Sequence, residues 1–167
     1  MNHSDRTETF RLYRIWLLLF LILPYGLQAQ TKTKVDIEQA DALLHNELIV
    51  ANAQRLIGDV RIRNNNIVMW CDSAYYYTNE NIVDGFGHVH IIKDDTLHLY
   101  SDFINYNANL KWAKAKDHVK LVNKTTTLTT DSLNYDMNRG IGYYDTYGTI
   151  VDSTTTLTSK IGEYYVD

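Results

Sequence analysis

A repeat of 29–30 residues runs through most of this chain and restricts the folds that it can adopt. Four segments begin with leucine or methionine and continue to a small residue followed by aspartate, or by lysine in the last copy: Met69–Asp72, Leu99–Asp102, Leu128–Asp131 and Leu157–Lys160. A tyrosine follows each segment at the same distance: Tyr76, Tyr106, Tyr135 and Tyr164. A weaker, earlier copy is Glu38–Asp41. Such periods are typical of units that stack and bury one another's apolar faces.

A second set of repeated positions predicts that each unit is built from strands. The set consists of Gly58–Val60, Gly87–Val89, Asp117–Val119 and Gly148–Ile150. Apolar and polar residues alternate after these positions, which is the pattern of a half-buried strand. Turn residues at 64–66, 93–95 and 123–124 separate each strand from the one that returns. Beyond residue 50 we therefore expect an all-β chain of repeated hairpins with essentially no helix.

Residues 36–46 fit two patterns. Glu38–Asp41 is the weak, earliest copy of the repeat, which predicts a strand. Ile37, Ala40 and Leu44 are also spaced as they would be on one face of a helix, so a short amphipathic helix is the alternative for this segment.

The aspartate of each repeat marks a change in which positions are apolar. Leu97 and Leu99 are odd-numbered, whereas Ile104 and Tyr106, beyond Asp102, are even-numbered. Because neighbouring residues of a strand face opposite sides, this change predicts a bulge or bend at the aspartate. We expect the aspartate carboxylates to accept hydrogen bonds from backbone N–H groups that the bend frees. We also expect the repeated tyrosines to form an aromatic ladder that stabilises neighbouring strands.

The first 29 residues have the layout of a secretory signal peptide. Three arginines precede the unbroken apolar run Ile15–Leu23, and Ala29 ends a small-residue cleavage motif. The run is short for a membrane span, although an uncleaved anchor is the alternative. We therefore expect residues 1–29 to be removed on export and residues 30–167 to form one domain.

Charge and cysteine content exclude several classes of protein. The formal net charge is −4, and without residues 1–29 there are 13 Lys and Arg against 18 Asp and Glu. Such a balance disfavours nucleic acid as a partner, because phosphates require a positive surface. Cys71 is the single cysteine, which excludes an intramolecular disulfide. We expect this residue to be small, buried and unreactive.

The repeat resembles that of the OstA-like family of periplasmic lipopolysaccharide-transport proteins. Leu56–Asp72 and Gly85–Asp102 carry the resemblance, and Val35–Asp41 is similar to the first strand of that family. The resemblance implies a solenoid-like β-jellyroll folded into a V, whose apolar interior holds the acyl chains of lipopolysaccharide. It also implies that jellyrolls stack edge to edge. Lys160, in place of the aspartate of the last copy, departs from the pattern and leaves a bridge-like or accessory role as the expectation.

The apolar alternation defines a candidate lipid-binding interior. The residues expected to point inward are Val60, Ile62, Met69, Val89, Ile91, Leu97, Leu99, Val119, Leu121, Leu128, Ile150 and Leu157. Burying acyl chains contributes about 0.8 kcal/mol per CH₂, so a few methylenes would hold a lipid without any catalytic residue. The alternative is an ordinary closed core without a ligand.

Other polar side chains do not point to catalysis or to a cofactor. His88, His90, His98 and His118 are the best candidates for metal ligands, because zinc accepts imidazole nitrogen and the four are expected on one face. That face alternates away from the apolar one, so we expect it to be solvated and not to be a metal site. No serine lies in the glycine pattern of a nucleophile elbow. We therefore expect a non-enzymatic protein without catalytic residues or cofactors.

Three functions from different classes follow. The first is a periplasmic lipid-binding module for lipopolysaccharide or a related glycolipid. The second is a structural or adhesive β-repeat of the cell envelope without a lipid ligand, and the third is a surface-glycan enzyme on a β-solenoid. Because the last repeat has no polar cap, we expect edge strands near 154–166 and 35–41 to pair with another copy or with another β-jellyroll protein.

Overall fold

The computed structural model describes residues 34–45 and 52–166, and every regular element in these ranges is a β-strand. The strands are β1 (Asp36–Gln39), β2 (Ala42–His45), β3 (Ala53–Asn64), β4 (Ile67–Tyr77), β5 (Ile82–Lys93), β6 (Leu97–Asn107), β7 (Trp112–Asn123), β8 (Thr126–Asp136), β9 (Ile141–Tyr144), β10 (Gly148–Val151), β11 (Thr156–Ser159) and β12 (Gly162–Tyr165). The predicted all-β class is confirmed. In this part of the chain no helix is long and apolar enough to cross a membrane. The predicted signal peptide, residues 1–29, lies outside the described residues and stays a prediction.

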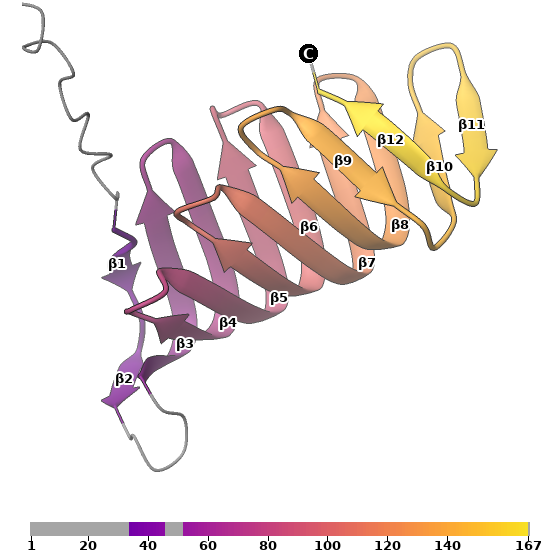
Figure 1. Cartoon of the computed structure of the whole chain (residues 1–167). Helices are drawn as coiled ribbons and strands as arrows, with labels where there is room; N and C mark the ends of the chain where they lie inside the picture. The colour runs from indigo at the N-terminus through magenta and orange to yellow at the C-terminus, as the bar shows by residue number, and fades with distance from the viewer. Residues whose placement is uncertain (1–33, 46–51, 167) are drawn as a thin grey trace, which may run out of the picture. The chain divides into compact units, whose positions relative to one another are not determined.

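The strands form one antiparallel sheet whose order largely follows the chain. The order is β1-β3-β4-β5-β6-β7-β8-β10-β11, with β2 also beside β3, β9 also beside β8, and β12 beside β9. Figure 1 shows the strands succeeding one another from indigo to yellow. Each unit of the repeat is therefore one hairpin laid against the previous one.

The long strands are divided near their middle, so that the sheet folds into two walls. The pairing register shifts once in every pair from β3·β4 to β7·β8. At one end β1 and β2 pair with different halves of β3, and at the other end β10 and β9 pair with different halves of β8. Wall A is the set of half-strands continuous with β1, β10 and β11, and wall B is the set continuous with β2, β9 and β12. The two walls lie as two layers in Figure 1.

Left-handed backbone produces the bends. At three bends, two residues in succession have φ between 39° and 74°. These residues are Gly58 and Asp59, Gly87 and His88, and Asp117 and His118. On β4, next to the second pair, the buried positions change from odd to even across Asp72, which confirms the bend predicted at the aspartate. Gly87 has φ 70°, which favours glycine, and a Cβ there would lie 2.2 Å from Asp72 Oδ2, so the Asp72 side chain would have to move.

The alignment predicted for the fourth copy of the repeat is wrong by two residues. Gly148 pairs with Thr130, whose other neighbour is Val119. Gly148 therefore takes the valine position of the repeat, and Thr146 and Tyr147 form the bend. Tyr147 has φ 59°, which matches the histidines at the same position of the earlier copies. The glycine that guided the alignment lies beyond this bend.

The walls enclose one hydrophobic core. Cys71 belongs to it and is 5% exposed, as predicted for a small buried residue. Burial raises the pKa of its thiol to about 11, which disfavours the reactive thiolate. The helix considered for residues 36–46 is wrong, because β1 and β2 are strands that pair with β3, while residue 46 lies outside the described residues.

Candidate functional site

One uninterrupted row of apolar side chains crosses wall A on its inner side. Nine cross-strand neighbours, one from each strand of wall A, make up this inner row: Ile37, Ile62, Met69, Ile91, Leu99, Leu121, Leu128, Ile150 and Leu157. Opposite residues on paired strands lie on the same face of a sheet. The sequence alternation therefore places the predicted inward residues on a single surface.

Ten of the twelve residues predicted to point inward are no more than 3% exposed: Val60, Ile62, Met69, Val89, Ile91, Leu97, Leu99, Val119, Leu121 and Leu128. Ile150 is partly buried against the core. Leu157 is 54% exposed, although it lies opposite Ile150 on the face predicted to point inward. It continues the inner row on β11, at the edge of the sheet, where no further strand covers it within the described residues.

The inner face of wall B completes the interior, and the sequence-based set of candidates omitted it. Its buried side chains include Leu56, Ala74, Val83, Ile104, Ala113, Ala115, Leu133 and Tyr144. The signal for them was present in the same alternation of apolar positions, continued beyond each aspartate. The two apolar faces thus meet inside the folded sheet, in one core cluster.

The repeated tyrosines lie on the inner face of wall B but do not stack on one another. Tyr76, Tyr106 and Tyr135 are each at most 2% exposed. Val83 separates the first two in the sheet, and Ala113 separates the second from the third. Because alternate strands are about 9–10 Å apart, the predicted ladder of contacting rings is wrong. The small residues between the rings leave them room to cross the interior.

The tyrosine hydroxyl groups reach the rim where the two walls approach each other. Tyr106 Oη, from wall B, donates a 3.1 Å hydrogen bond to Asn64 Oδ1, at the end of β3 in wall A. Tyr76 Oη donates to Asn81 Oδ1 at 3.0 Å. The hydroxyl of Tyr135 is buried without a hydrogen-bond partner. Burial raises the pKa of Tyr106 and Tyr135, so both phenols stay protonated.

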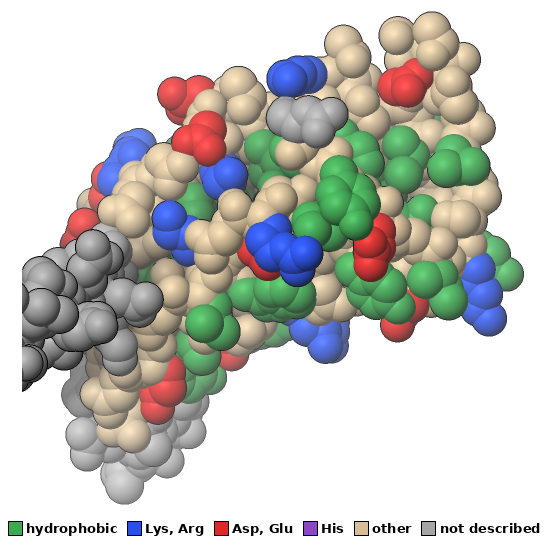
Figure 2. Space-filling view, turned by 45° about the horizontal axis from the view of Figure 1, so that its top comes forward, with side chains coloured by type: hydrophobic (Ala, Val, Ile, Leu, Met, Phe, Trp, Pro, Cys, Tyr) green, Lys and Arg blue, Asp and Glu red, His purple; other side chains and the backbone are tan. Residues whose placement is uncertain are grey.

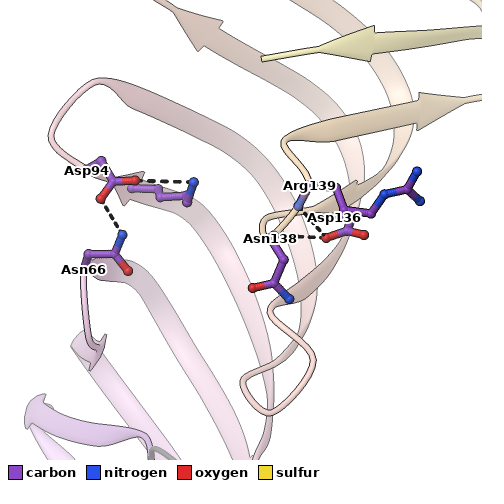
Figure 3. A network of polar contacts seen from close by, with 6 residues as sticks. Asn66, Asp94, Asp136, Asn138 and Arg139 are labelled. Atoms are coloured by element: carbon purple, nitrogen blue, oxygen red, sulfur yellow. Dashed lines mark hydrogen bonds and ion pairs between the residues drawn. The ribbon is translucent and has the colours of Figure 1, made fainter. Parts of the chain in front are cut away.

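Polar turns border this rim. Asp94, in the turn between β5 and β6, accepts a hydrogen bond from the amide of Asn66 and lies 3.3 Å from Lys93 Nζ. Asp136, at the end of β8, accepts hydrogen bonds from the backbone N–H groups of Asn138 and Arg139, both at 3.0 Å. Figure 3 shows these two groups of contacts in their separate turns. The mouth of the folded sheet is therefore polar, whereas its interior is apolar.

The aspartates at the bends bind histidine side chains. Asp72 Oδ2 lies 2.8 Å from His88 Nδ1, and Asp102 Oδ2 lies 2.7 Å from His118 Nδ1. The carboxylates make no hydrogen bond to a bend N–H within the described residues, so that predicted role is wrong. The hydrogen bond from each aspartate raises the pKa of its histidine.

The four histidines considered as metal ligands do not come together. His90 Nε2 and His98 Nδ1 are 3.0 Å apart on the outer face of wall A, whereas His88 and His118 each bind a different aspartate. His90 also stacks on Trp70 and Tyr100, with ring centroids 5.5 and 4.3 Å apart. Within the described residues no three His, Cys, Asp or Glu side chains have the arrangement of a metal site.

Comparisons with known proteins agree with this architecture. The family model described as OstA-like protein matches residues 32–167. A similar solved structure is that of LptH from Pseudomonas aeruginosa, described as the LptA-homologous periplasmic component of the conserved lipopolysaccharide transport device. The two chains have a TM-score of 0.59 and 15% identity, and the match covers 81% of this chain and 96% of LptH. No curated protein matches. At this identity the structural likeness concerns the fold alone, which confirms the predicted β-jellyroll.

Proposed function

This chain belongs to the OstA-like protein family, and on that premise we propose that it is a periplasmic, non-enzymatic carrier of lipopolysaccharide or a related glycolipid. The acyl chains lie between walls A and B, against the inner row. The observation that supports this most strongly is the continuity of the row, which extends from Ile37 on β1 to Leu157 on β11 without a polar interruption. An apolar core that only stabilises the fold does not require the inner row to extend to an exposed edge of the sheet.

The energetic basis is apolar transfer. Each methylene that leaves water contributes about 0.8 kcal/mol, and an interior lined by leucine, isoleucine and valine provides the apolar surroundings. The polar turns around Asp94 and Asp136 border the mouth, where the polar headgroup would stay in contact with water. Figure 2 shows hydrophobic side chains alternating with charged ones on the surface seen there, without one continuous apolar face.

Acyl chains enter only when the walls separate. Residues such as Leu99 and Leu121 are 0% exposed, so their surfaces are covered by neighbouring side chains. The hydrogen bond from Tyr106 to Asn64 joins the two walls near the mouth and must break or shift as they part. The unpaired hydroxyl of Tyr135 opposes separation less, because it has no such bond to lose.

The two ends of the sheet suit the addition of further strands. At one end Leu43 and Leu44 on β2 are 52% and 49% exposed. At the other end Leu157 on β11 and Tyr165 on β12 are 54% and 59% exposed. Edge strands offer N–H and C=O groups to another strand. We propose that a second copy or another β-jellyroll protein pairs with these edge strands. The inner row would then continue from one molecule into the next.

A structural or adhesive β-repeat without a lipid remains the second candidate, and the near-complete burial of the inner row favours it. In that case the edges act and the interior only stabilises the fold. The two proposals differ in whether any acylated molecule contacts the inner row.

Photo-crosslinking in cells distinguishes the two. Probes at Met69, Leu99 and Leu128 should capture lipopolysaccharide or a similar glycolipid, whereas probes at the outward positions His98 and Lys120 should not, since neighbouring residues face opposite sides of the sheet. Leu99→Asp should abolish capture at Met69, because a charge in the interior is costly to desolvate. Equal capture on both faces, or capture on neither, would remove the lipid carrier and leave the structural role.

A further inference from the structure

A polar cleft of about 520 Å³ lies on the outer side of the molecule, beside the bend of β7 and β8. The loop between β9 and β10 forms its third side. The side chains that matter below are His118, Lys120, Thr129, Asp131, Thr146 and Tyr147. None of them belongs to the inner row, so the cleft and the interior are separate surfaces of the same sheet.

The cleft coincides with a break in the pattern of the bends. In the two preceding copies the second bend residue is a histidine that binds an aspartate, as His118 binds Asp102 at 2.7 Å. In the fourth copy Tyr147 stands at this position, and Asp131 is the corresponding aspartate. A phenol does not form the same pair, and the Asp131 carboxylate has no hydrogen bond or ion pair within the described residues. The substitution thus leaves an acceptor available beside an aromatic ring.

The Tyr147 ring is held outward on a fixed backbone. The side chain is 64% exposed. Its backbone N–H donates to the carbonyl of Lys160 at 3.0 Å, and its carbonyl accepts a 2.7 Å hydrogen bond from Thr130 Oγ1. Its φ of 59° is uncommon for a residue with a Cβ. A rigid loop that presents a large exposed ring is pre-organised for binding.

The lining chemistry selects the class of ligand. Asp131 accepts hydrogen bonds and Lys120 donates them. The hydroxyl of Thr129 donates a 3.4 Å hydrogen bond to the carbonyl of Thr149 and can accept another from a ligand. The Tyr147 ring provides an apolar surface for C–H groups. An acyl chain would leave these polar groups unpaired, and an anion would meet the carboxylate of Asp131. A ring with several hydroxyls and an apolar face, which is a sugar, satisfies all of these groups.

We propose that this outer cleft binds a saccharide, with Tyr147 packed against one face of a sugar ring and Asp131, Lys120 and Thr129 bound to its hydroxyls. The ligand is an uncharged oligosaccharide segment, either of a free glycan or of the glycan part of a glycolipid. The site does not depend on the lipid-carrying interior. It adds a second, sugar-specific contact to the surface of the molecule.

Titration of the ¹⁵N-labelled protein with maltotriose, cellotriose and triacetylchitotriose tests the site. At millimolar concentrations at least one trisaccharide should cause saturable amide shifts at Thr129, Asp131 and Tyr147, and not at the interior Leu99. Tyr147→Ala should weaken the binding by roughly tenfold, the effect of losing one well-placed aromatic contact. Asp131→Asn should weaken it by a smaller factor, since the amide keeps one acceptor.

Tyr143→Ala is the matched control, because this tyrosine is 37% exposed on wall B and does not line the cleft. It should bind the trisaccharide as the unaltered protein does. The proposal is overturned if no trisaccharide gives saturable shifts, if both tyrosine variants lose binding equally, or if inorganic phosphate shifts the same amides at lower concentration than the sugars.

A further arm separates the two sources of the sugar. Leu99→Asp, which removes acyl-chain binding in the proposed carrier, should leave trisaccharide binding unchanged. Lipopolysaccharide that shifts the Tyr147 amide of the unaltered protein places the glycan part of a glycolipid in the cleft, whereas trisaccharide shifts without a shift by lipopolysaccharide assign the cleft to a free glycan. Loss of trisaccharide binding in Leu99→Asp, with its fold intact, would contradict an independent outer site.

Discussion

Tyr106 and Asn64, 42 residues apart in the chain, are joined by a hydrogen bond that connects wall B to wall A inside the folded sheet. Both residues are at most 2% exposed. The bond joins the apolar interior to the rim, and it lies where the walls must part if the interior is to admit a ligand.

Removing this hydroxyl should therefore loosen the closed state. Tyr106→Phe should lower the free energy of unfolding by about 0.5–1.5 kcal/mol, the usual net value of one hydrogen bond. Tyr135→Phe is the matched control, because that buried hydroxyl has no partner, and it should be neutral or stabilising. Urea unfolding of both variants measures the difference, and equal destabilisation would show that the hydrogen bond does not hold the walls together.

The bend between Gly87 and Asp72 should be sensitive to a single methyl group. Gly87→Ala should destabilise the protein by about 1–3 kcal/mol, because φ is 70° and the new Cβ would collide with the Asp72 carboxylate. Adding Asp72→Ala removes the collision but not the unfavourable φ, so the double variant should recover part of the loss. Thermal unfolding of the three proteins checks this, and a double variant less stable than Gly87→Ala would contradict it.

The two histidine–aspartate pairs predict the order in which the histidines titrate. Hydrogen bonds from Asp72 and Asp102 raise the pKa of His88 and His118, whereas burial lowers that of His90. In an NMR titration His88 and His118 should thus hold their protons to higher pH than His90. Asp72→Asn should lower the pKa of His88 and leave that of His118 in place.

The raised pKa of His88 determines how its pair with Asp72 contributes to the free energy of unfolding at different pH values. A pKa that folding raises adds stability that is complete below the unfolded value, near 6.5, and is lost as pH rises through the folded value. His88→Gln should thus cost most below pH 6 and nothing at high pH. Both members of the pair are solvent-exposed, so salt should reduce the effect. A cost that grows with pH would contradict the assignment.

The exposed apolar edge predicts self-association that depends on one end of the sheet. Leu157→Glu should reduce concentration-dependent association, because the leucine continues the inner row at the open edge of β11. Leu110→Glu is the control, since this leucine is 64% exposed in the turn between β6 and β7, away from the edge strands. Analytical ultracentrifugation measures the change. Monomers at every concentration, or equal effects of both variants, would argue against strand addition.

Much of this architecture was predictable because repetition and alternation are properties of the sequence itself. Apolar residues change from odd to even positions beyond Asp102, and this change predicted a bend. Ten of the twelve residues predicted to point inward are buried, because side chains alternate between the two faces of a strand. The identity of the residues that form the bend did not follow. Tyr147 alone adopts left-handed backbone at this bend, and no glycine precedes it, so the sequence marker pointed to Gly148.

Contacts between strands were harder to predict than the strands. The repeat indicated that Asp72 is structural, but its partner, His88, lies on the next strand, and only the pairing register brings them together. Likewise the spacing of the tyrosines is regular in the chain, yet Ala113 and Val83 lie between them in the sheet. Whether wall B closes on wall A depends on packing between the two faces. The pattern of residues along one strand carries no information about that packing.

The agreement between strand order and chain order has a consequence for how the molecule forms. From β4 to β7 each strand pairs with the strand before it and the strand after it in the chain, so its pairing does not depend on a distant segment. Short loops cost little closure entropy, and topologies of this kind fold faster than sheets with long crossovers. A chain that leaves a narrow pore from its N-terminal end can therefore pair these strands one hairpin at a time. At the C-terminal end, β8 with β10 and β9 with β12 are pairs that skip over intervening strands, so they form later.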